Sequence, residues 1–113
     1  MNIESLREFC LSLPHATEDV KWGADICFSI GGKMFCVSGF SQPLHASLKV
    51  NDEEFEEVSS HQGIIPAPYL ARYKWVLISE EAGLTDKQWK HYIAQSYELI
   101  KGKLPKKVLK ELA

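Results

Sequence analysis

Apolar residues recur at helical spacing near both ends of the chain. Ile3, Leu6, Cys10 and Leu13 follow Asn2, which is a favourable N-cap residue, so the spacing predicts a first helix. Residues 89–100 carry apolar side chains at positions i, i+3, i+4, i+8 and i+11 after a Thr-x-x-Gln capping box, which predicts a long helix. A short last helix is expected from position 105 onwards.

The middle of the chain has the alternation and turn residues of β-structure. Two apolar runs flank Gly31-Gly32, a sequence typical of a two-residue hairpin turn. That turn fixes the register, and the expected pairs are Ile30 with Lys33, Phe28 with Phe35, Cys27 with Cys36 and Ile26 with Val37. The register gathers one apolar face, made of Ile26, Phe28, Phe35 and Val37.

Further strands and one short helix are expected between positions 15 and 79. A short strand is expected within 15–25, and residues 45–50 alternate with Ala46, Leu48 and Val50 on one side. An acidic helix capped by Asn51 should cover 52–58, followed by a loop over 59–68 and a strand over 73–79. The prolines at 66 and 68 should fix the path into that last strand, with Trp75 as its buried anchor.

These elements predict an α+β fold over a single domain, residues 1–113. Hairpins without βαβ spacing indicate an antiparallel sheet of about five strands, with helices packed on one face as a two-layer sandwich. A chain of 113 residues is long enough to bury a core without metal or disulfide support.

The charge of the chain is small overall but unevenly distributed. The net charge is −2 and the isoelectric point is near 6.1, which argues against a strongly basic nucleic-acid binder. Residues 1–86 carry a net charge of −7, however, and residues 87–113 carry +5. We therefore expect any acidic partner to bind the C-terminal quarter.

Other features set the expected compartment. No apolar run approaches the roughly 18 residues that span a bilayer, and the N-terminus lacks the apolar segment of a signal peptide. The three cysteines are an odd number without a CxxC pair, so they indicate neither a disulfide framework nor a zinc site. We expect a cytoplasmic protein with no membrane association.

Several short motifs, in order and at their spacing, give the chain a recognisable signature. They are "SLPHATEDVKWG", "GGKMF", "SLKV", "PAPYL", the tryptophan at position 75 and "SYEL". The set extends from about Phe9 to Ile100 and resembles the MmcQ/YjbR family of small bacterial proteins. One departure is His15, which stands where the family pattern has the glycine of an "LPG" turn.

This resemblance implies a compact two-layer domain similar to type III secretion chaperones, found in the cytoplasm. It also implies DNA binding, an assignment that depends on the shape of the fold and its exposed hairpins and not on a catalytic signature. A chaperone-like module that binds an unidentified protein or peptide is the alternative function, and it is an analogy between folds.

The residue types support the same pair of hypotheses. Phosphate groups require cations, and single strands also require exposed aromatic rings on which bases stack. The candidate nucleic-acid-binding residues are Trp22, Lys33, Lys49, Tyr69, Arg72, Lys74, Lys101, Lys103, Lys106 and Lys107. The acidic helix should face away from the nucleic acid. Alternatively, the tryptophans belong to the core and the lysines are solvated strand ends and a solubilising tail.

Catalytic or redox chemistry has a weaker basis in the sequence. Cys27 and Cys36 would face each other at a non-hydrogen-bonded pair, a geometry that allows a strained, reversible disulfide, although two buried apolar thiols are the simpler interpretation. The four histidines lack metal-ligand spacing, and "GGK" lacks the length of a phosphate-binding loop. We expect no enzymatic activity, no cofactor and no metal.

Overall fold

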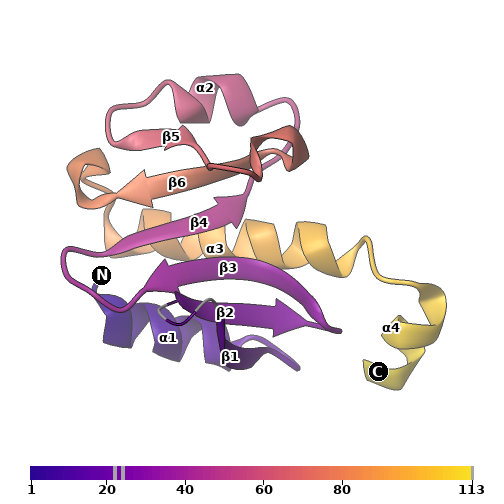
Figure 1. Cartoon of the computed structure of the whole chain (residues 1–113). Coiled ribbons are helices and arrows are strands. Elements are labelled where there is room, and N and C mark those ends of the chain that lie inside the picture. Colours follow the sequence, from indigo (N-terminus) through magenta and orange to yellow (C-terminus); the bar gives the residue numbers. More distant parts are fainter. Residues whose placement is uncertain (22, 24, 113) are drawn as a thin grey trace.

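Six antiparallel strands form one sheet, and helices cover one of its faces (Figure 1). The computed structural model describes residues 1–21, 23 and 25–112. The strand order is β1-β2-β3-β4-β6-β5, so β1 and β5 are the edges. The strands are β1 (Thr17–Lys21), β2 (Asp25–Ile30), β3 (Lys33–Gly39), β4 (His45–Lys49), β5 (Ile64–Pro66) and β6 (Trp75–Ser79).

The helices confirm the predicted α+β architecture. They are α1 (Ile3–Ser12), α2 (Phe55–Ser59), α3 (Asp86–Lys101) and α4 (Lys106–Leu112), with short 3₁₀ turns η1 (Ala71–Tyr73) and η2 (Glu80–Ala82). The predicted N-cap at Asn2 and the predicted capping box at Thr85 both form, and Asn2 makes a full capping box with Ser5. Ser5 donates its backbone N–H to the Asn2 side chain at 2.8 Å, and Gln88 donates its N–H to the Thr85 hydroxyl at 3.1 Å.

The core lies between the sheet and the helical layer. Helix α3 packs across β3 and β4, and its Tyr97 ring meets Phe35 edge-on at 5.4 Å between centroids. The predicted alternation of residues 45–50 is confirmed, because Ala46, Leu48 and Val50 are fully buried. Trp75 and Trp89 are also buried, as expected, although Trp75 pairs with Lys49 and so lies on the sheet face opposite the helices.

A β-bulge changes the predicted register of the β2–β3 hairpin. Ile30 pairs with Lys33 as the turn requires, but the register shifts between Phe28 and Ser29. Beyond the shift, the pairs are Phe28 with Cys36, Cys27 with Val37 and Ile26 with Ser38. Val37 therefore leaves the predicted apolar face and lies on the sheet face opposite the helices.

The predicted pair of Cys27 and Cys36 is wrong for the same reason. The bulge places Cys36 beside Phe28 on the helix-facing side, whereas Cys27 projects to the outer face. Cys36 instead lies against Cys10 of α1, and their hydrogen bond together with burial raises the pKa of the Cys10 thiol. All three cysteines are free and buried.

Helix α3 supplies hydrogen bonds at the bulge. The hydroxyl of the fully buried Ser96 donates to the Phe35 carbonyl at 2.6 Å and accepts from the Lys49 backbone N–H at 2.9 Å. Buried backbone groups need such partners, since an unpaired one costs about 1–3 kcal/mol. Ser96 thereby stabilises the irregular part of β3 from the helical layer.

Three further segments differ in detail from the predictions. Helix α2 begins at Phe55 and has Glu54 at its N-cap, so Asn51 does not cap it. The last predicted strand begins at Trp75, and the predicted loop over 59–68 includes the edge strand β5. A proline in an edge strand is tolerated because its missing N–H is not needed for pairing on the outer side.

Candidate nucleic-acid interface

The candidate cations come from separate parts of the chain and lie at one end of the molecule. The β2–β3 turn, the C-terminal end of α3 and α4 lie at the right of Figure 1, and β4 runs toward that side. We call this the basic end and define it by Lys33, Arg72, Lys74, Lys101, Lys103, Lys106 and Lys107, with Lys49 buried beneath them.

Contacts between these segments hold the basic end together. A Cβ at Gly31 would lie 2.7 Å from the Leu104 side chain and 3.0 Å from Val108, so the hairpin turn packs against α4 and the residues leading into it. Val50, just after β4, donates its backbone N–H to the Lys74 carbonyl at 2.9 Å. Segments far apart in sequence therefore present their lysines together.

Lys49 does not occupy the exposed position expected of a phosphate contact. It is 5% exposed, and its ammonium donates to the Tyr73 carbonyl at 2.5 Å. Burial lowers the pKa of Lys49, and the nearby charges of Lys103 and Lys74 lower it further against the opposing charge of Asp52. Lys49 thus adds positive potential from below the surface, and its direct contact with a phosphate is not supported.

The loop 67–74 between β5 and β6 carries three of the candidates. Tyr69 and Lys74 both have left-handed backbones, with φ of 67° and 66°, a region that residues other than glycine rarely adopt. The Arg72 guanidinium lies 4.7 Å from the Tyr73 ring centroid and donates to the Tyr73 hydroxyl at 2.7 Å. Tyr69 is 99% exposed.

The acidic segment borders the basic end, so the prediction that it faces away is wrong in part. The Lys74 ammonium lies 5.0 Å from the ring centroid of Phe55, the first residue of α2. Asp52 is near enough to act on Lys49. We therefore assign the larger share of the accessible positive charge to the C-terminal lysines.

A hollow of about 540 Å³ opens on the outer face of the sheet beneath this loop. Its lining comes from three strands and the loop, namely Asp25, Met34, Val37, Ser47, Pro68, Tyr69 and Leu70. We call it the Tyr69 hollow. The sequence singles out only two of these residues, Tyr69 as a binding candidate and Pro68 as a turn residue. It does not predict the others as lining residues, because the bulge that turns Val37 outward leaves no signal in the apolar pattern.

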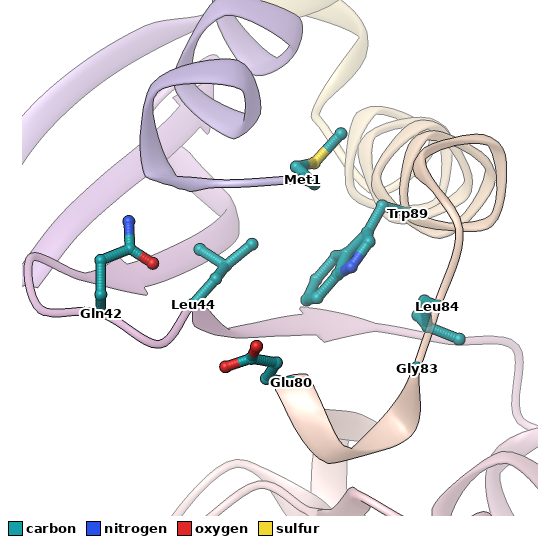
Figure 2. Close-up of a pocket in the computed structure, with 7 residues that line it drawn as sticks. All are labelled: Met1, Gln42, Leu44, Glu80, Gly83, Leu84 and Trp89. Atoms are coloured by element: carbon teal, nitrogen blue, oxygen red, sulfur yellow. The ribbon is translucent and has the colours of Figure 1, made fainter.

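A second hollow, of about 370 Å³, lies at the opposite end of the molecule. It is lined by Met1, Gln42, Leu44, Glu80, Gly83, Leu84 and Trp89 (Figure 2). Figure 2 shows the Gln42 amide, the Glu80 carboxylate and the Trp89 ring around one space. We call it the Trp89 hollow. Its lining includes the Glu80 carboxylate, and the ammonium of Met1 is already paired with Asp86, so it does not suit a phosphate.

Other predicted features can be stated briefly. Trp22 lies outside the described residues. Within residues 1–21, 23 and 25–112, no helix is long and apolar enough to cross a bilayer. The same residues contain no cluster of three His, Cys, Asp or Glu side chains that could hold a metal ion.

Comparison with solved structures supports the fold. The crystal structure of Deinococcus radiodurans protein DR2400, with a DUF419 domain, has a TM-score of 0.87 and 28% identity, covering 98% of this chain and 87% of that one. A protein from Pseudomonas syringae has a TM-score of 0.74 at 18% identity, covering 88% of this chain and 99% of that one, a likeness that shows the fold alone.

Comparison at the level of sequence gives the family. No curated protein matches the chain. The YjbR family model matches residues 11–99, which include the whole sheet and most of α3. The ordered motifs and the six-stranded architecture agree with that match, and the chain belongs to the YjbR family.

Proposed function

We propose that this protein binds DNA weakly and largely without regard to sequence, through the basic end. The observation that carries the proposal is the meeting of the cations of that end without close carboxylate partners. Within the described part of the chain, the ion pairs are Met1 with Asp86 and Arg7 with Glu18, and neither involves the basic end. The charges of the basic end remain available to phosphates.

The chemistry of these residues explains why the binding would be weak and sequence-neutral. Lysine contacts to phosphate position a protein on DNA but carry no base information. The net charge of −2 and the acids of α2 oppose the approach of a polyanion, so the affinity depends strongly on the ionic strength. We propose a binding role and no catalytic one.

Salt dependence provides the first test. Each phosphate contact releases counterions, so four contacts predict a loss of affinity of about 100-fold between about 50 and 200 mM salt. Fluorescence anisotropy with labelled duplex and single-stranded DNA would measure this loss. An absence of binding to both DNAs at low salt would contradict the proposal.

Matched charge reversals test the location of the surface. The double variant Lys103→Glu/Lys106→Glu should abolish most of the binding, and Lys74→Glu should weaken it less. The control Lys87→Glu/Lys90→Glu makes the same change in net charge in the first turns of α3, roughly 20 Å from its other end. If both double variants lose affinity equally, the basic end is not the binding surface.

The alternative, a module for a protein or peptide partner, gives a different salt response. The outer sheet face has Ile65 52% exposed and includes the Tyr69 hollow, so an apolar segment could pack there. Binding through apolar surface is nearly independent of salt. A ligand whose affinity is unchanged over the same salt range would favour this second function.

A further inference from the structure

We propose that the Tyr69 hollow receives one unstacked base of a single strand, and that it prefers bases with an exocyclic amino group. This inference rests on the DNA-binding function proposed above and adds the part of the ligand that the hollow contacts. The protein would then contact unpaired bases of DNA as well as its phosphates.

The state of Tyr69 is the first observation behind this inference. Its ring is 99% exposed and its backbone has a φ of 67°, so the chain holds a large aromatic side chain in solvent on a conformation that disfavours it. The described core does not use this ring. An exposed aromatic ring is the element on which proteins stack the bases of single strands.

The hollow beside the ring suits the flat, apolar faces of a base. Met34, Val37 and Leu70 supply aliphatic surface, and the volume of about 540 Å³ lies within the range of small-ligand sites. A base that is stacked and paired inside a duplex cannot enter such a hollow. The geometry therefore favours a single strand over a duplex.

One cation stands beside the hollow. Arg72 follows the lining residue Leu70 by two positions, within about 7 Å of chain. Lys33 precedes the lining residue Met34, but neighbouring strand residues point to opposite faces, so Lys33 does not border the hollow. A base in the hollow would thus have the Arg72 guanidinium near an adjoining phosphate, which argues for a nucleic acid over an uncharged apolar segment.

The polar groups of the lining explain the preference among bases. The Asp25 carboxylate, when ionised, only accepts hydrogen bonds, and the Ser47 hydroxyl can donate or accept. Cytosine and adenine carry an exocyclic amino group that donates to a carboxylate, whereas thymine presents a carbonyl oxygen at that position. Asp25 therefore favours cytosine over thymine, two bases of the same ring size.

Binding of oligo-dC, oligo-dT and a duplex, each about 12 nucleotides long, tests this inference at low salt. The wild-type protein should bind oligo-dC about fivefold more tightly than oligo-dT. Tyr69→Ala should weaken oligo-dC binding about tenfold and leave duplex binding unchanged. Phe40→Ala is the matched control, since Phe40 is another aromatic residue, 53% exposed, outside both the hollow and the basic end.

Asp25→Asn tests the base preference separately. Removal of a negative charge should raise the affinity for both oligonucleotides, so the ratio of the two affinities is the quantity to compare. The amide can donate to thymine as well as accept from cytosine, and the ratio should fall to about one. Thermal unfolding of each variant would verify that the fold is retained.

The outcomes distinguish this inference from the function on which it rests. If single strands bind with the predicted salt dependence but Tyr69→Ala and Phe40→Ala both behave as wild type, the hollow takes no base and the phosphate-binding surface stands. Equal affinity of the wild-type protein for oligo-dC and oligo-dT would overturn the role of Asp25. If no DNA binds, both proposals fail together.

Discussion

The Tyr69 hollow and the Trp89 hollow use their aromatic residues in opposite ways. Trp89 is 4% exposed and belongs to the core, whereas Tyr69 is 99% exposed and contributes nothing to it. Each hollow is lined by one acid, Asp25 or Glu80, but Arg72 lies two residues from the lining of the Tyr69 hollow. The two hollows thus differ in whether their aromatic residue packs in the core, and our proposal depends on that difference and not on cavity volume.

The largest expected difference between the two hollows is in stability. Trp89→Ala should lower the free energy of unfolding by about 3–5 kcal/mol, because it removes a buried indole and leaves a cavity. Tyr69→Ala should change it by less than about 0.5 kcal/mol, since the ring has no packing to lose. Urea unfolding of both variants would measure the contrast, and equal losses would show that the loop 67–74 is part of the cooperative core.

A smaller effect tests how the basic end is held together. Gly31 and Gly32 both have positive φ, 58° and 83°, so alanine at either position should cost about 1–2 kcal/mol in backbone strain. A methyl group at Gly31 would also meet Leu104 and Val108, whereas nothing lies within 4 Å of one at Gly32.

Gly31→Ala should therefore destabilise the protein by about 1 kcal/mol more than Gly32→Ala. It should also weaken DNA binding, because it displaces α4 from the hairpin turn. Urea unfolding and anisotropy on the same two variants would measure both effects. Identical DNA affinities would mean that the position of α4 does not matter for binding.

The smallest effect concerns Tyr97 of α3, the helix that joins the two ends. Its hydroxyl donates to the Pro14 carbonyl at 2.6 Å, so Tyr97→Phe should cost about 1 kcal/mol at neutral pH. Burial, with a contribution from Glu98, raises the pKa of Tyr97 above its ordinary value of 10.0.

The sign of the pH effect follows from this raised pKa. The unfolded chain loses the phenol proton first, so the stability of the wild-type protein falls as the pH rises through about 10. Tyr97→Phe removes this pH-dependent contribution to stability. The difference in free energy of unfolding between the two proteins should therefore shrink at alkaline pH. Thermal unfolding from neutral pH to about pH 11 would show this, and a difference that stays constant would mean that Tyr97 ionises equally in both states.

The sequence predicts those elements whose signals are local. The N-cap at Asn2, the capping box at Thr85, the turn at Gly31-Gly32 and the alternation of residues 45–50 all appear in the structure. The shift beside Phe28 could not be predicted, because Cys27, Phe28, Phe35 and Cys36 are all apolar and a one-residue slip leaves the pattern unchanged. That slip also conceals Val37 as a lining residue.

The other features that the sequence does not predict depend on contacts between segments far apart in the chain. The clustering of lysines in residues 101–110 is visible in the sequence, but their approach to the hairpin turn depends on how α3 ends. Lys49 shows the polar alternation of a solvated residue, yet the loop 67–74 covers it. Alternation along a strand predicts the sheet face on which a residue lies, but it does not predict which loop covers that face.

His15 shows how the left-handed turn tolerates a departure from the family pattern. Its φ is 63°, in the left-handed region that glycine adopts most readily, so the histidine takes a backbone conformation suited to the glycine of the family pattern.

The free edge of β1 has a consequence for self-association. Among the strands of residues 1–21, 23 and 25–112, β1 pairs on one side alone, which makes its outer edge a place where a second copy could add on. Antiparallel pairing centred on Asp19 would bring two identical carboxylates face to face, and like charges directly opposite each other oppose pairing. In that register the charge of Asp19 opposes the addition of a second copy to the edge of the sheet.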